Sequence, residues 1–252
     1  ASLKYFFTSQ GNESYNIVKY GSNSIKIALS NKKDNIIWNQ VLQVINNNLK
    51  FSGYFQTQFT NEYIKLASSG LNVPDVSKYK YQNFDYLTWG NIEEVQINGQ
   101  KKHKINIQIY NTDYGLSVMD KTYIFTPQDM RETAHILSDL ILYSITGQMG
   151  YFRSKIVFLS EPKLPSQNSI RDIYIMDQDG YGLKKLTNSK MIITHPSYFA
   201  QHKKLFYVDL TTGESKIRFI DILTGKDDKI HGITSALMKK EFYNQAFTCL
   251  LY

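Results

Sequence analysis

The sequence predicts an α+β N-terminal domain, with a mixed sheet and two main helices, followed by an incomplete β-propeller of about two blades. Residues 1–148 alternate between strand patterns of period two and two amphipathic stretches of helical period. After Gly150 no helical period recurs, and short apolar runs lie between Gly, Asp, Asn and Pro turns. We therefore expect two domains, residues 1–148 and 149–252.

The first strand and helix have clear sequence signals. Residues 24–30 alternate apolar and polar side chains, which predicts a half-buried strand. Asp34 or Asn35 can then cap a helix that ends near Gly53. Its apolar stripe consists of Ile37, Val41, Val44, Ile45 and Leu49.

Three strands are expected next. Residues 84–97 and 103–110 both show strand patterns, and the Asn-Gly pair at 98–99 signals a hairpin, in a loop longer than two residues. The loop NTDYG at 111–115 leads to the third strand, 117–125.

The second helix has a strong start and a strong stop. Residues 126–129, Thr-Pro-Gln-Asp, offer a hydroxyl cap, a proline at the first helical position and an acid in the first turn. Gly147 ends the helix, and His135 is expected to be a packed or surface residue beside its stripe. The stripe consists of Ala134, Leu137, Leu140, Ile141 and Ile145.

An internal repeat indicates the propeller. KIVFLS at 155–160 is echoed by KLFYVD at 204–209, and IYIMD at 173–177 by IRFID at 217–221. Spacings of 49 and 44 residues with several strands per unit are typical of propeller blades. A weaker sequence similarity indicates the start of a third unit at Ile233. Because a closed ring needs at least about four blades, we expect a fragment, a truncated gene or a part that needs a partner.

Several of these segments resemble the TolB family of periplasmic propeller proteins. SGYF at 52–55 is similar to the end of the family's first helix, and residues 126–161 to its second helix and first propeller strand. IYIMDQDGYGLKKLT at 173–187 is similar to its blade motif. The family's Trp-Ser-Pro-Asp-Gly turn is replaced at 198–202 by Tyr-Phe-Ala-Gln-His, and most of its six blades are missing.

The resemblance implies a non-enzymatic component of the Tol-Pal machinery, which supports outer-membrane integrity and cell division. It implies a periplasmic location after removal of a signal peptide, and contact with membranes through partners only. No cofactor is implied. The implied partners are the peptidoglycan-associated lipoprotein, bound through the propeller, and TolA, bound through the N-terminus.

The N-terminal residues are the candidate partner-binding site. Leu3, Tyr5, Phe6 and Phe7 could add to a sheet edge as an extended strand. The alternative is that they form the first strand of the domain.

A metal site is the alternative for the acidic stretch at 177–180. An EF-hand loop that starts at Asp177 would place Asp179 third and Asn188 twelfth, where a bidentate Glu is needed. In the second copy of the repeat, 44 residues later, Asp221 stands at the position of Asp177, but Leu223 stands at the position of Asp179. We therefore expect a hairpin turn and no metal.

A hydrolase is the alternative function, as a fragment of a propeller-bearing peptidase. The chain has no Gly-x-Ser-x-Gly elbow. His195, His202 and His231 lack the spacing of zinc ligands, and residues 1–148 offer only His103 and His135 as a base. No catalytic residue is therefore assigned.

Composition limits the remaining classes. The net charge is +7. Pairs of lysines are scattered beside turns and do not form one basic stripe, which argues against a nucleic-acid surface. The single cysteine, Cys249, cannot form an internal disulfide. No run approaches the length of a membrane-spanning helix.

Overall fold

The computed structural model describes residues 24–69, 72–160, 170–187 and 191–229. The chain divides into two compact units, Ala1–Phe152 and Arg153–Tyr252. The residues of the candidate N-terminal site, Leu3, Tyr5, Phe6 and Phe7, lie outside the described part, as does the third repeat at Ile233.

The first unit is a mixed sheet with helices on both faces, so the predicted N-terminal architecture is confirmed. Its five-stranded sheet has the order β2-β1-β5-β6-β7, in which β1 is parallel to β2 and β5 and the other neighbours are antiparallel. The strands are β1 (Ile25–Asn31), β2 (Phe55–Asn61), β5 (Tyr86–Ile97), β6 (Gln100–Asn111) and β7 (Leu116–Phe125). The helices are α1 (Ile36–Phe51), α2 (Val76–Tyr81) and α3 (Met130–Thr146). A separate two-stranded sheet joins β3 (Ile64–Leu66) to β4 (Asn72–Pro74).

Helix α1 crosses from β1 to β2 and begins where the sequence predicts. The Oδ1 of Asn35 accepts a hydrogen bond from the Trp38 N–H at 2.9 Å, so Asn35 is the cap. The Asn35 Nδ2 also donates to the carbonyl of Ile92 at 2.9 Å, which ties the start of α1 to β5. The helix ends at Phe51, two residues before Gly53, whose φ is +74°.

Helix α3 starts differently from the prediction. Pro127–Asp129 form a turn of 3₁₀ helix, and the α-helix begins at Met130. The Thr126 hydroxyl donates to the Asp129 carboxylate at 2.5 Å and makes no capping bond to the backbone, so the predicted hydroxyl cap is wrong. At the other end Gly147 adopts the left-handed conformation and donates to the Tyr143 carbonyl at 2.8 Å, as predicted.

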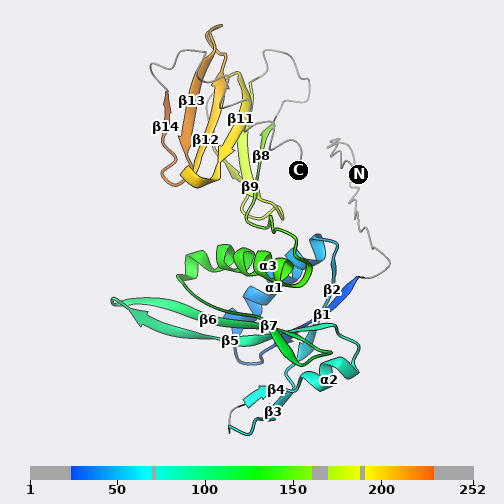
Figure 1. Ribbon diagram of the computed structural model, residues 1–252. Helices are drawn as coiled ribbons and strands as arrows, with labels where there is room; N and C mark the ends of the chain where they lie inside the picture. The colour runs from blue at the N-terminus through cyan, green and yellow to red at the C-terminus, as the bar shows by residue number, and fades with distance from the viewer. Residues whose placement is uncertain (1–23, 70–71, 161–169, 188–190, 230–252) are drawn as a thin grey trace. The chain divides into compact units, whose positions relative to one another are not determined.

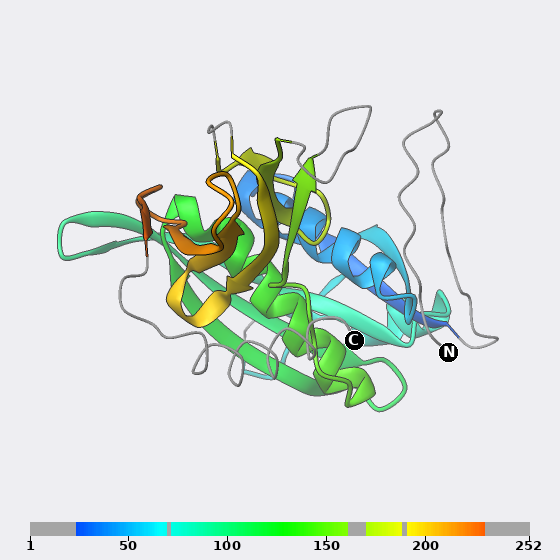
Figure 2. The same cartoon turned by 90° about the horizontal axis from the view of Figure 1, so that it is seen from above.

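Two apolar cores lie on opposite faces of this sheet. Figures 1 and 2 show α1 and α3 side by side on one face, where they cover the larger core of the unit. Trp38 is completely buried in this core, and its Nε1 donates to the Ser30 carbonyl at 2.8 Å. Helix α2, which the sequence did not predict, covers a smaller core on the other face that includes Tyr79 and Leu87.

The hairpin between β5 and β6 corrects the expected loop length. The strands pair without interruption as far as Ile97 and Gln100, so only Asn98 and Gly99 lie in the turn. Their φ angles of +51° and +74° are those of a two-residue type I′ turn. The strand pattern is hidden because residues 100–104 are polar and largely exposed.

In its described residues, the second unit contains two antiparallel sheets around one apolar cluster. The three-stranded sheet has the order β10-β9-β8 and the four-stranded sheet β11-β12-β13-β14. The strands are β8 (Lys155–Ser160), β9 (Asp172–Asp177), β10 (Lys184–Lys185), β11 (Ile193–Phe199), β12 (Lys204–Asp209), β13 (Lys216–Asp221) and β14 (Asp227–Lys229). Ile173 and Ile193, one from each sheet, are completely buried in the shared cluster.

The repeated segments form equivalent pairs of strands. In β8 and β9, Lys155 lies opposite Asp177, and in β12 and β13, Lys204 lies opposite Asp221. Both pairs are antiparallel and keep the same register from the lysine to the end of the strand. The sequence repeat is therefore a repeat of structure.

Candidate interaction site

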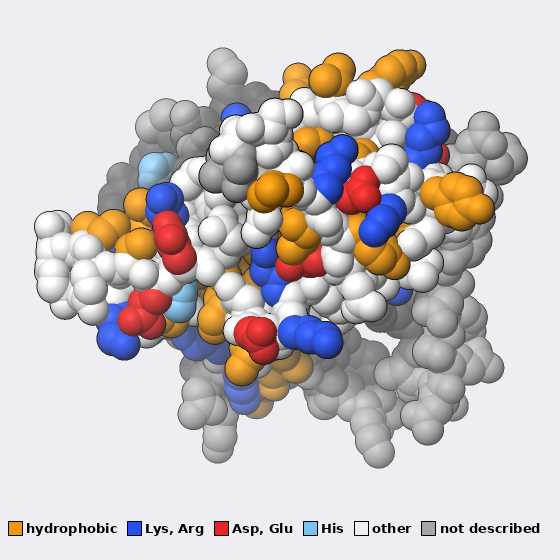
Figure 3. Space-filling model, turned by 90° about the horizontal axis from the view of Figure 1, so that it is seen from below, with side chains coloured by type: hydrophobic (Ala, Val, Ile, Leu, Met, Phe, Trp, Pro, Cys, Tyr) orange, Lys and Arg blue, Asp and Glu red, His pale blue; other side chains and the backbone are white. Residues whose placement is uncertain are grey.

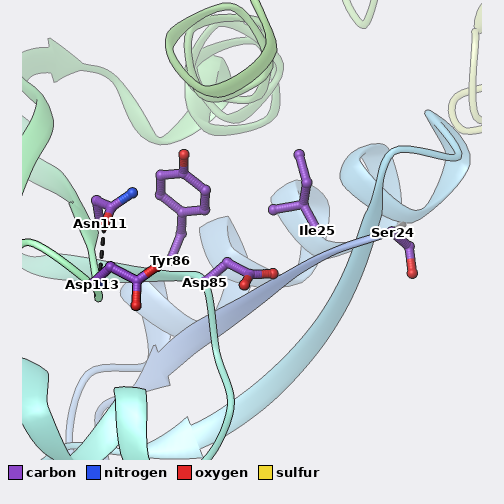
Figure 4. Close-up of a pocket in the computed structure, with 6 residues that line it drawn as sticks. All are labelled: Ser24, Ile25, Asp85, Tyr86, Asn111 and Asp113. Carbon is purple, nitrogen blue, oxygen red and sulfur yellow. Dashed lines mark hydrogen bonds between the residues drawn. The ribbon is translucent and has the colours of Figure 1, made fainter. Parts of the chain in front are cut away.

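A polar pocket lies at the end of the first unit's sheet, where β1 and β5 begin and β6 ends. Its volume is about 460 Å³, and Figure 4 shows the side chains that line it. They are Ser24, Ile25, Asp85, Tyr86, Asn111 and Asp113. Ser24 is the first described residue, and Ile25 begins β1.

Asp85 organises the centre of the pocket. Its carboxylate accepts a hydrogen bond from the Lys26 N–H at 2.7 Å, and its own N–H donates to the Lys26 carbonyl at 2.9 Å. The Asp85 carbonyl accepts from the Thr112 N–H at 3.0 Å. One acidic residue thus fastens the start of β1 to the loop after β6, which fixes the shape of this end of the sheet.

Asn111 shapes the opposite rim. Its Oδ1 accepts hydrogen bonds from the N–H groups of Asp113 at 3.0 Å and Tyr114 at 3.2 Å. The asparagine side chain thus closes the turn that follows β6. Gly115 completes the turn with φ +67°. The Asp113 carboxylate lies 3.3 Å from the Lys80 ammonium of α2 and remains largely exposed. Tyr114, beside it, is 78% exposed.

The chemistry of this pocket favours binding. The described residues that line it supply two carboxylates, a hydroxyl, an amide and a phenol, and none of them is a histidine, cysteine or lysine. A serine nucleophile needs a general base within hydrogen-bond reach, normally a histidine. The lining therefore suits hydrogen-bond donors or a cation from a partner. The loop NTDYG at 111–115, which the sequence predicts as a turn, supplies Asn111 and Asp113 to this pocket.

The histidines considered as a catalytic base lie elsewhere in the first unit. His103 lies on β6, with its ring 5.6 Å from that of Phe125. His135 is buried on α3, and its Nδ1 lies 2.9 Å from the Nδ2 of Asn48. The same Asn48 amide donates to the Ser138 hydroxyl at 2.9 Å, so these polar groups join α1 to α3. Neither histidine lines the pocket.

The stretch 173–187 forms the predicted hairpin between β9 and β10. The Gly180 N–H donates to the Asp177 carbonyl at 2.9 Å, and the Asp177 N–H to the Tyr181 carbonyl at 2.9 Å. The Asp177 carboxylate forms an ion pair with Lys155, and the Asp179 carboxylate accepts from the Tyr181 N–H at 3.1 Å. The backbone bonds close the turn between β9 and β10, and the ion pair joins β9 to β8.

Two of the remaining histidines lie in the second unit, His195 within strand β11 and His202 at a turn. His195 has φ +51° at a break in the register of β11, and its Nδ1 lies 2.8 Å from the Thr194 hydroxyl. His202 ends a short 3₁₀ turn before β12. His231 and Cys249 lie outside the described residues.

Charges on the described residues are interspersed. Basic side chains alternate with acidic ones on the face in Figure 3. Several lysines of the first unit form ion pairs, including Lys32 with Glu62 at 2.7 Å and Lys104 with Glu93 at 3.1 Å. This pattern differs from the continuous basic stripe of nucleic-acid binders.

Comparison with known proteins finds a likeness for the first unit. Residues 15–115 match the family model of the TolB amino-terminal domain. This segment of the first unit is similar to a TolB amino-terminal domain. The likeness to TolB extends further, since the chain is 28% identical over 235 residues to the Tol-Pal system protein TolB of Rickettsia massiliae (strain Mtu5). This match covers 91% of the chain and 52% of the relative.

The solved structure of a TolB shows the same fold. The crystal structure of TolB from Acinetobacter baumannii matches with a TM-score of 0.65 and 22% identity, over 84% of this chain and 50% of that one. The resemblance to TolB predicted from the sequence is therefore confirmed. The chain spans about half the length of the TolB proteins it matches. None of the helices in the described ranges is long and apolar enough to cross a membrane.

Proposed function

We propose that the chain is a TolB-like, non-enzymatic interaction component of the Tol-Pal machinery in the periplasm, where it supports outer-membrane integrity and cell division. The observation that carries this proposal is the match of residues 15–115 to the TolB amino-terminal domain. Sequence likeness to a Tol-Pal system protein over 91% of the chain supports it. The function needs no cofactor, because strands, loops and aromatic anchors can supply the recognition.

We assign one proposed partner to each of the two proposed domains. Residues 149–252, as propeller repeats, would contact the peptidoglycan-associated lipoprotein. The equivalent registers of the two strand pairs support a repeat of this kind. Residues 1–148 would contact TolA through the extreme N-terminus, where Leu3, Tyr5, Phe6 and Phe7 provide apolar anchors.

The hydrolase alternative lacks a supporting observation. His103 lies beside Phe125 and His135 lies in a buried polar network, and neither belongs to the lining of the pocket. We therefore retain a single candidate function.

Direct binding measurements test the proposal. The purified chain is titrated by calorimetry with the periplasmic part of TolA and with the lipid-free lipoprotein. We expect saturable binding to both. Tyr5→Ala with Phe7→Ala should weaken TolA binding at least about tenfold, because truncated aromatic anchors dominate such losses, and should leave lipoprotein binding unchanged. Tyr143→Ala, which truncates an exposed aromatic residue of α3, is the matched control. Absence of binding to both partners would contradict the proposed function.

A further inference from the structure

Strand β2 lies at one edge of the five-stranded sheet, and within the described residues its outer side pairs with no other strand. Its first five residues, Phe55–Phe59, read Phe-Gln-Thr-Gln-Phe, which is the same in both directions. An edge strand exposes a row of unpaired N–H and carbonyl groups that a further strand can bond. A palindrome at such an edge makes the second copy of the same strand a natural occupant.

The five side chains alternate between the two faces of the sheet. Phe55 and Phe59 pack against the core under α1, and the Thr57 hydroxyl donates to the side-chain Oδ1 of Asn46 on α1 at 2.5 Å. Gln56 and Gln58 point to the opposite face and are exposed. All seven pairs of β2 with β1 are in regular register, so the strand is straight enough to accept a partner along its length.

Antiparallel pairing of two β2 strands about Thr57 brings like residues together. Thr57 would lie opposite Thr57 of a second copy, Gln56 opposite Gln58, and Phe55 opposite Phe59. Such threonine and aromatic cross-strand pairs are stabilising, whereas like charges directly opposite are destabilising. Because β2 has no charged residue, this register contains no repulsive pair. A two-fold axis produces a self-complementary interface of this kind.

The other edge of the sheet is protected against such pairing. In β7, Val118 is an extra residue at a break in the register with β6, and the Ser117 hydroxyl donates to the Met119 carbonyl at 2.8 Å. Asp120 and Lys121 follow as exposed charges. Bulges and charges are the devices by which edge strands avoid adding a neighbour. Strand β2 carries neither within its seven residues.

We propose that the chain forms a two-fold dimer through antiparallel pairing of β2 with β2 of a second copy, centred on Thr57. The five-stranded sheets of the two copies would then form one continuous sheet. Tyr54, which immediately precedes the strand and is 44% exposed, would lie opposite Thr60 of the second copy. The proposal is independent of the proposed function.

The first experiment measures the mass of the chain by sedimentation velocity between about 1 and 100 µM. We expect a concentration-dependent dimer. Gln56→Lys with Gln58→Lys would place lysine opposite lysine twice across the axis, and should raise the dissociation constant about tenfold or more. Leu116→Lys with Val118→Lys adds the same charge on β7 and should leave the dimer unchanged. Circular dichroism melting checks that both variants fold.

The second experiment tests the register. A third variant carries Gln56→Glu with Gln58→Glu and should also be monomeric. Mixing it with the lysine variant should restore a dimer, because each lysine then lies opposite a glutamate.

A parent chain that stays monomeric to 100 µM overturns the proposal. So does a dimer that the lysine pair on β2 leaves intact, or a loss that mixing does not restore.

Discussion

Asn35 has two roles at the residue scale, and each uses a different atom of one amide. Its Oδ1 caps α1 through the Trp38 N–H, and its Nδ2 donates to the Ile92 carbonyl on β5. The sequence predicts the first role, since Asn is a preferred cap before an apolar stripe. The second role depends on β5 lying beside the start of α1, which is a matter of tertiary structure.

Substitutions of Asn35 can separate these roles. Asn35→Ala removes both hydrogen bonds and should lower the free energy of unfolding of the first unit by about 2 kcal/mol. Asn35→Asp keeps the cap acceptor but loses the donor to Ile92, so we expect a smaller loss, of about 1 kcal/mol. Urea unfolding of the three chains measures both values. Equal losses for the two variants would mean that the cap bond to the Trp38 N–H adds nothing.

At the scale of elements, the pairing of β5 with β6 depends on Gly90. Its φ is +153°, and a Cβ placed there would lie 2.1 Å from the Asn106 carbonyl oxygen and 3.0 Å from the Ile107 Cα. Both of these atoms belong to the backbone of β6, so no rotamer change relieves the clash. The central strands of the sheet must therefore separate to admit a side chain.

Replacement of this glycine has a matched control in the same hairpin. Gly90→Ala should lower the free energy of unfolding by at least about 2 kcal/mol, through strain and lost strand pairing. Gly99→Ala also forces alanine into a positive φ, but nothing lies within 4 Å of its Cβ, so about 1 kcal/mol is expected. Chemical denaturation followed by tryptophan fluorescence compares them. A cost for Gly90→Ala no larger than that for Gly99→Ala would show that the close approach is unimportant.

At the scale of the whole molecule, two turn carboxylates link the stability of the second unit to pH. Burial opposes ionisation of Asp209, but its hydrogen bonds from the Thr211 N–H and hydroxyl outweigh this and lower its pKa. The N–H groups of Thr224 and Leu223 donate to Asp221 and likewise lower its pKa. Both groups therefore bind protons less readily in the folded chain than in the unfolded one.

Because both folded pKa values are lowered, the second unit should lose stability as the pH falls. A carboxylate with a lowered folded pKa contributes stability that is fully present above its unfolded pKa, about 4. That stability is lost as the pH falls through the folded pKa. We expect the second unit to unfold more easily with each step below about pH 4.

Melting temperatures between pH 7 and 2.5 measure this dependence. Asp209→Asn with Asp221→Asn should flatten the acid limb, whatever the effect of these substitutions at neutral pH. An acid limb as steep as that of the parent chain would assign the effect to other carboxylates.

Much of the first unit could be predicted because its signals are local. The stripe from Ile37 to Leu49, the Asn35 cap and Gly147 each depend on residues within a few turns of one another. Helix α2 was missed because its six residues carry no amphipathic repeat long enough to recognise. The length of the β5–β6 turn was missed because the polar start of β6 shows no strand alternation.

The sequence by itself determined the kinship with TolB, both main helices and the repeat in the second unit, because these depend on periodicity, caps and motifs. Only the tertiary structure decided which residues meet across long separations. It places Asp85 between Lys26 and Thr112, and it makes the palindrome at Phe55–Phe59 an edge of the sheet. The physical reason is that strand order and edge exposure come from pairing between distant segments, which leaves no mark in a local pattern.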